Sequence, residues 1–202
     1  MKLSVDQILT HQKKTNYTKK IFLISGNEET LIKGVEKNLL SLFGPKDELE
    51  VFIKEGGLLN DSSVFETEAS LFSKSKIILH RNPKEINIDS LKNINFENTV
   101  IIITDTSLKS SSSIKKKFDL HQEYYSISCY KLTRTFKKKF TDEFLLKNSI
   151  VFESEAYWFF LDNSSVFFGL FESELKKIRD YGGEKEKKES WIEGYKKWKA
   201  RK

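Results

Sequence analysis

Short apolar runs alternate with helical patterns along the first 130 residues of this chain. Residues 21–25 and 100–104 are continuous apolar runs, the pattern of strands that are buried on both faces. Further strands are predicted at residues 50–54, 76–80 and 124–128, with helices at residues 5–12, 31–42, 61–71, 89–94 and 110–121. Five strands that alternate with helices imply an α/β fold with a mostly parallel sheet flanked by helices, a style of fold that often binds nucleotides.

The period of the apolar residues changes after Tyr130. Phe136, Phe140 and Phe144 recur every four residues, and two further helical patterns follow up to Ile178. We therefore predict an α/β domain at residues 1–132 and a small three-helix domain at residues 133–180. Residues 181–202 form a charged tail, either helical or disordered, in which Trp191, Tyr195 and Trp198 have the spacing of one helical stripe.

Composition favours a soluble, cytoplasmic protein of 202 residues with a substantial core. The chain has 38% hydrophobic residues and sixteen phenylalanines, but no apolar run reaches the roughly 18 to 20 residues that span a bilayer. Cys129 is its single cysteine, so no intrachain disulfide forms, and the three histidines lie too far apart in the sequence to suggest a metal site. The net charge of +6 makes nucleic acid or an acidic protein surface a plausible partner.

The turn after the first apolar run lies where this fold places a phosphate-binding loop. A Walker A loop needs a second glycine, a lysine and a serine or threonine after its first glycine, because these residues and the loop amides hold phosphates and magnesium. If the loop begins at Gly26 and continues through Asn27, the place of the second glycine holds Leu31, that of the lysine holds Ile32 and that of the serine or threonine holds Lys33. Lys33 comes one position late, and the glycine and the hydroxyl are missing, so we interpret this loop as degenerate.

The acidic half of an ATPase site is also incomplete. Asp105 follows the apolar run 100–104, but Thr106 stands where the catalytic acid is expected. An N-cap of the next loop is the more ordinary role for Asp105. The chain has no nucleophile elbow, and Cys129 next to a predicted strand favours a buried thiol. We expect no catalytic residues, no cofactor and no metal.

Residues 65–81 read as a helix that ends just before a strand, with Leu71 and Phe72 side by side at the junction. Adjacent helical residues point about 100° apart, so when one packs inward the other tends toward the edge or the solvent. Two interpretations stay open. The pair either fixes the helix end onto the sheet or is displayed as an apolar plug for a partner's pocket.

Several segments, in this order and spacing, resemble the delta subunit of the bacterial DNA polymerase III clamp loader. They are residues 1–3, 22–28 with Leu31, 52–56, 69–73 running into 76–78, 100–104, 112–116, 128–130 and 172–178. The resemblance implies an AAA+-like domain without a working ATP site, followed by a three-helix lid. It extends over residues 1–178. Members of this family continue into a third, helical collar domain, which we do not expect in this sequence.

The resemblance also implies a function. The helix that ends in Ala69, Ser70, Leu71 and Phe72 would insert its apolar residues into the sliding clamp and help to open the ring. The other partners would be clamp-loader subunits and primed DNA, with no membrane. Such a chain has no active site of its own, although it would belong to a DNA-directed DNA polymerase holoenzyme.

Basic residues near the end of the α/β domain and the start of the helical domain are candidates for contacts with the DNA backbone. They are Lys115, Lys116, Lys117, Arg134, Lys137 and Lys138. A solvated face is the alternative, because adjacent lysines are distributed around a helix and do not line one side. Two other functions stay open. One is an active P-loop-like nucleotide-dependent enzyme, and the other is a basic DNA-binding protein with no clamp partner.

Overall fold

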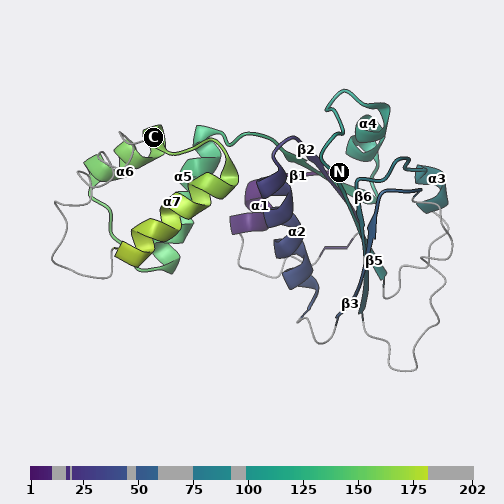
Figure 1. Cartoon of the computed structure of the whole chain (residues 1–202), viewed down its shortest axis with the longest axis horizontal. Helices are drawn as coiled ribbons and strands as arrows, with labels where there is room; N and C mark the ends of the chain where they lie inside the picture. The colour runs from purple at the N-terminus through teal and green to yellow at the C-terminus, as the bar shows by residue number, and fades with distance from the viewer. Residues whose placement is uncertain (11–16, 19, 45–48, 59–74, 92–98, 182–202) are drawn as a thin grey trace. The chain divides into compact units, whose positions relative to one another are not determined.

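The computed structural model describes residues 1–10, 17–18, 20–44, 49–58, 75–91 and 99–181 (Figure 1). The chain divides into two compact units, one from Met1 to Tyr130 and the other beginning at Lys131. The predicted clamp-binding residues 69–72 lie outside the described residues, as do residues 182–202 of the predicted tail.

The first unit is built on one parallel sheet. Its strands are β1 (Lys2–Leu3), β2 (Ile21–Gly26), β3 (Leu49–Glu55), β4 (Ser75–Arg81), β5 (Thr99–Asp105) and β6 (Tyr124–Cys129). They pair in the order β1-β6-β2-β5-β4-β3, and every neighbouring pair is parallel. The predicted fold class is confirmed, with six strands in place of five. The extra strand is β1, whose two residues are too few to show a periodic pattern.

Helices cover both faces of this sheet (Figure 1). Helices α1 (Val5–Thr10) and α2 (Glu29–Phe43) lie on one face, and α3 (Ile88–Leu91) and α4 (Ser113–Leu120) lie on the other. On the α4 face, Ile21, Ile103 and Phe118 belong to one buried cluster. The alternate strand residues, such as Phe22, are fully buried on the face of α2. Because both faces are covered, the central strands are apolar throughout, as the sequence pattern indicated.

Among its described residues, 131–181, the second unit has three helices, α5 (Arg134–Lys147), α6 (Ser154–Asn163) and α7 (Phe168–Tyr181). Aromatic rings fill the space between them. The rings of Phe160 and Phe171 lie 5.8 Å apart between centroids, and Phe140 lies 5.9 Å from Phe171. Thr133 caps the start of α5, because its hydroxyl accepts a hydrogen bond from the backbone N–H of Phe136.

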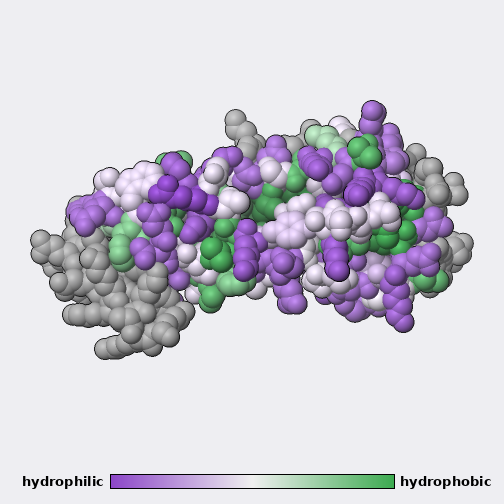
Figure 2. Space-filling model, turned by 90° about the horizontal axis from the view of Figure 1, so that it is seen from above, coloured by the Kyte–Doolittle hydropathy of each residue, from purple (hydrophilic) through white to green (hydrophobic). Residues whose placement is uncertain are grey.

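The surface mixes polar and apolar residues. In the face shown by Figure 2, hydrophilic residues cover much of the surface, and hydrophobic residues form smaller patches between them. Within the described ranges, no helix combines the length and the apolar character needed to cross a membrane.

Candidate functional site

The connection between β2 and α2 is a tight turn in which glycine is required. The strand ends at Gly26 and the helix begins at Glu29, so only Asn27 and Glu28 connect them. Gly26 has φ +152°, and a Cβ atom on it would lie 1.8 Å from the backbone oxygen of Cys129 on the neighbouring strand β6. Gly26 therefore serves the close approach of β6, which explains its presence without a phosphate.

Glu28 fills the N-terminal end of α2. Only 5% of this residue is exposed, and its backbone N–H donates to the oxygen of Cys129 at 3.3 Å. Its carboxylate accepts hydrogen bonds from the backbone N–H of Leu31 at 2.5 Å and from the hydroxyl of Thr30 at 2.6 Å. The first turn of a helix attracts anions, because its N–H groups are unpaired and carry partial positive charge. Here the chain's own carboxylate takes the place that a phosphate would occupy.

The turn is also too short to surround a phosphate. In a Walker A loop, four residues separate the two glycines and the loop amides cradle the phosphate. Here α2 begins after two residues, so Lys33 lies within the helix with its side chain exposed. The structure thus does not assemble Gly26, Asn27 and Lys33 into a phosphate cradle.

Asp105 caps the loop that follows β5, as the sequence suggested. Its Oδ1 accepts hydrogen bonds from the backbone N–H of Ser107 at 2.8 Å, from the Ser107 hydroxyl at 2.9 Å and from the N–H of Leu108 at 3.0 Å. Thr106 turns to another partner, since its backbone N–H and its hydroxyl both donate to Asn82 Oδ1. Among the residues that the structure describes, no group of His, Cys, Asp and Glu could hold a metal ion.

Cys129 is buried, and its thiol is unreactive at neutral pH. Burial raises the pKa of its thiol to about 12, and the negative charge of Glu28 acts in the same direction. A thiol with so high a pKa is almost wholly protonated at neutral pH, and the thiolate is the reactive form. The prediction of a structural cysteine therefore agrees with its surroundings.

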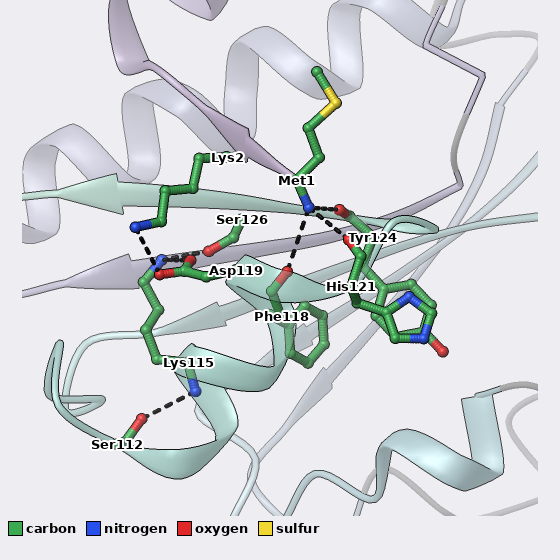
Figure 3. Close-up of polar contacts among 9 residues, drawn as sticks. All are labelled: Met1, Lys2, Ser112, Lys115, Phe118, Asp119, His121, Tyr124 and Ser126. Atoms are coloured by element: carbon green, nitrogen blue, oxygen red, sulfur yellow. Dashed lines mark hydrogen bonds and ion pairs between the residues drawn. The ribbon is translucent and has the colours of Figure 1, made fainter.

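The expectation that Lys115 contacts DNA is wrong, because this lysine is only 3% exposed. Its ammonium group donates to the hydroxyl of Ser126 and pairs with Asp119 at 3.4 Å, while Asp119 also pairs with Lys2 at 3.2 Å (Figure 3). Burial lowers the pKa of Lys115, and the charge of Asp119 opposes that effect. Lys115 thus joins α4 to β6 inside the first unit and cannot reach a phosphate.

The prediction that Lys137 contacts DNA is also wrong. It is 5% exposed, and its ammonium group donates to the backbone oxygen of Leu161 at 2.6 Å and to the backbone and hydroxyl oxygens of Ser164 at 3.1 and 3.2 Å. These oxygens lie at the C-terminal end of α6, where helical carbonyls lack partners within the helix. Lys137 therefore closes that end of α6 and ties it to α5.

The other four basic residues are exposed, but two of them have partners. Lys138 pairs with Asp142 at 2.8 Å on the same helix. Arg134 pairs with Asp162 at 2.8 Å, and its guanidinium lies over the ring of Trp158 at 5.3 Å. Lys116 and Lys117 both face solvent on α4. The six predicted residues do not share one role, because two are structural and two are engaged in surface ion pairs.

Comparisons with known proteins agree with this picture at the level of fold. The chain is similar to the Bacillus subtilis DNA clamp loader delta protein, with a TM-score of 0.58 and 15% sequence identity. The match covers 83% of this chain and 55% of the delta protein, so the chain spans little more than half the length of that relative. An identity this low shows a shared fold alone, and that fold agrees with the predicted parallel sheet flanked by helices.

More distant similarities are to the RuvB Holliday junction branch migration motor of Thermotoga maritima and to DnaA of Aquifex aeolicus in complex with AMPPCP. The RuvB structure has a TM-score of 0.45 and 13% identity, and the match covers 87% of this chain and 59% of that one. The DnaA structure has a TM-score of 0.42 and 14% identity, with coverages of 96% and 64%. No protein-family model matches the chain, and a search of curated proteins finds no match.

Proposed function

We propose that this chain is a non-catalytic subunit of a replication clamp loader, of the delta type in the DNA polymerase III holoenzyme. It binds the sliding clamp through the apolar pair Leu71 and Phe72 and helps to open the ring for loading onto primed DNA. The observation that carries the proposal is a fold like that of a clamp-loader delta protein in which Glu28 closes the nucleotide-binding turn. Such a role places the chain in the cytoplasm with other clamp-loader subunits.

The closed turn argues against the alternative of a P-loop-like enzyme. A nucleotide would have to displace the Glu28 carboxylate from Leu31 and Thr30, and it would then find only a two-residue connection in place of a loop. Two like charges cannot share one helix end without a large electrostatic cost. The scaffold is therefore suited to binding a protein partner without hydrolysing ATP.

The proposed clamp contact rests on the sequence resemblance at residues 69–73, which precede β4 in the chain. Burial of two large apolar side chains contributes about 1.5 to 3 kcal/mol each. A pair of such residues is enough to anchor a transient complex when polar contacts surround it. Contacts with the DNA backbone are proposed for Lys116 and Lys117, which face solvent, and for Arg134 and Lys138, whose surface ion pairs a phosphate would displace.

A binding experiment with substituted chains tests this function. The double variant Leu71→Ala/Phe72→Ala is compared with the unmodified chain for binding to the sliding clamp of the same organism, by surface plasmon resonance. Leu146→Ala is the matched control, because Leu146 is 82% exposed on α5 and has no proposed role. We expect the double variant to lose clamp binding by at least a hundredfold, on the order of 3 kcal/mol, while the control binds normally.

Thermal unfolding of the same variants distinguishes a solvent-exposed Leu71–Phe72 pair from one that is packed in the core. A displayed pair can be truncated with little change in stability, whereas each buried residue of this size costs about 2 to 5 kcal/mol when cut to alanine. A large fall in the melting temperature of the double variant would show that the pair belongs to the core. Unchanged clamp binding by a folded double variant would contradict the proposed contact.

A further inference from the structure

The outermost strand of the sheet, β3, carries two apolar side chains, Val51 and Ile53, that are exposed to solvent. β3 is the last strand in the pairing order, and the described residues place no strand beside its outer edge. Val51 is 39% exposed and Ile53 is 60% exposed, whereas their register partners Ile77 and Leu79 on β4 are completely buried. Within the part of the chain that the structure describes, the helices on this face therefore leave both side chains exposed.

The backbone of β3 presents hydrogen-bonding groups at the same edge. Just beyond the strand, the N–H of Gly56 donates to the backbone oxygen of Arg81 at 2.8 Å, so Gly56 faces β4. Backbone groups of successive strand residues point alternately to the two sides of the strand. Even-numbered residues therefore bond β4, and the N–H and C=O groups of Val51 and Ile53 point to the open edge. Exposed edges of this kind are templates for pairing with another chain.

The sequence of β3 is complementary to itself when two copies run antiparallel about Phe52. Val51 then lies opposite Ile53 of the second copy, and Glu50 lies opposite Lys54. Directly opposed residues of an antiparallel pair lie on the same face of the sheet. Val51 of each copy therefore contacts Ile53 of the other copy, and Glu50 of each copy faces the oppositely charged Lys54 of the other. Residues that exchange hydrogen bonds across such a pair are those whose backbone points outward, which here are Val51 and Ile53.

We propose that β3 binds a second copy of this chain by antiparallel pairing centred on Phe52, which joins the two sheets into one. Self-complementarity selects this partner, because every attractive contact in this register occurs twice under a twofold axis. Lys54 also donates to the backbone oxygen of Leu58 at 3.4 Å. The Phe52 ring, on the other face, is covered by the Lys76 ammonium group at 4.8 Å.

The expected dimer is weak and reversible. One strand of seven residues buries less than the roughly 1,600 Å² of a standard interface. The molecular mass measured by sedimentation should therefore rise with protein concentration, from 23.6 kDa toward twice that value.

Charge reversal on the full chain tests the register. Glu50→Lys places a lysine opposite Lys54, and Lys54→Glu places a glutamate opposite Glu50, so each single variant should sediment as a monomer at concentrations where the unmodified chain is dimeric. A mixture of the two single variants should form a heterodimer, and the double variant Glu50→Lys/Lys54→Glu should recover the homodimer. Lys33→Glu, a charge reversal at an exposed position of α2, should leave the dimer unchanged.

Three results would overturn the proposal. A monomeric mass for the unmodified chain over a hundredfold range of concentration would mean that Glu50 and Lys54 guard the edge against pairing. Single variants that dimerise normally would show that the two chains associate through another surface. A mixture of the two single variants that stays monomeric would contradict the pairing of Glu50 with Lys54. The outcome is independent of the clamp-binding experiment, because no residue of β3 takes part in the proposed clamp contact.

Discussion

Replacing Glu28 with alanine removes the carboxylate that closes the N-terminal end of α2. In the native chain this carboxylate is buried and accepts hydrogen bonds from Leu31 N–H and the Thr30 hydroxyl. Loss of an N-cap costs about 0.5 to 2 kcal/mol. Because the Leu31 N–H is also left buried without an acceptor, which costs about 1 to 3 kcal/mol, the expected loss is about 1 to 3 kcal/mol in all.

Chemical denaturation followed by circular dichroism measures this loss. Glu28→Gln keeps one acceptor oxygen but removes the charge that favours a helix N-terminus, so it should lie between alanine and the unmodified chain. Glu29→Ala is the matched control, because Glu29 is exposed in the first turn of the same helix and should change stability by less than about 0.5 kcal/mol. Equal stability of the two alanine variants would refute the capping role of Glu28.

The same variant tests the closed turn as a nucleotide site. If the two-residue connection is too short for a phosphate, Glu28→Ala should still show no saturable binding of ATP by calorimetry. Tight ATP binding by Glu28→Ala would mean that the carboxylate alone blocks an otherwise competent site. Tight binding by the unmodified chain would contradict the whole assignment of a degenerate loop.

Three further predictions follow from the buried and exposed polar groups. Lys137→Met should destabilise the second unit by about 1 to 3 kcal/mol, since three oxygens at the end of α6 lose their donor. Lys138→Met should change the free energy of unfolding by less than about 1 kcal/mol, because its ion pair lies on the surface. Lys116→Ala/Lys117→Ala should weaken DNA binding and lower its logarithmic salt slope by up to about 0.9 for each lost contact, and an unchanged slope in a fluorescence titration would remove both lysines from the interface. The Cys129 thiol has a folded pKa of about 12 against an ordinary 9.0, so its contribution to stability is complete below pH 9 and is lost as the pH rises toward 12. The free energy of urea unfolding of the unmodified chain should therefore decline more steeply than that of Cys129→Ala in this range, by up to about 1.4 kcal/mol per pH unit.

The sheet was predictable from the sequence because its central strands are covered on both faces. Apolar runs at residues 21–25 and 100–104 are readable without any partner information, and they became β2 and β5. β1 was missed because its place beside β6 depends on a backbone pairing between residues more than 120 positions apart. The α-ammonium group of Met1 also contributes there, since it donates to the backbone oxygens of His121 and Tyr124, and no local pattern encodes that contact (Figure 3).

The sequence predicted that the nucleotide-binding loop is degenerate, but it did not predict that the Glu28 carboxylate occupies the helix end. Missing Walker residues are visible in the sequence, whereas Glu28 is recognised as the substitute anion only when its carboxylate is seen at the helix end. The lysine interpretations failed for a geometric reason. The innermost positions of α5 are Lys137, Thr141 and Leu145, one residue later than the half-buried phenylalanine series that the spacing emphasised. Lys115 shares a helical face with Phe118, three residues on, and that spacing is the signal that could have identified it as buried.

Binding of the purified chain to the sliding clamp of its own organism, measured with and without ATP, tests whether the chain is a clamp-binding subunit that needs no nucleotide. We expect a saturable complex whose dissociation constant is the same in the presence and absence of nucleotide, since Glu28 closes the turn that a phosphate would need. Failure to bind the clamp at concentrations up to about 100 μM, which corresponds to less than about 5.5 kcal/mol of binding free energy, would contradict it. Binding that requires ATP would contradict it equally.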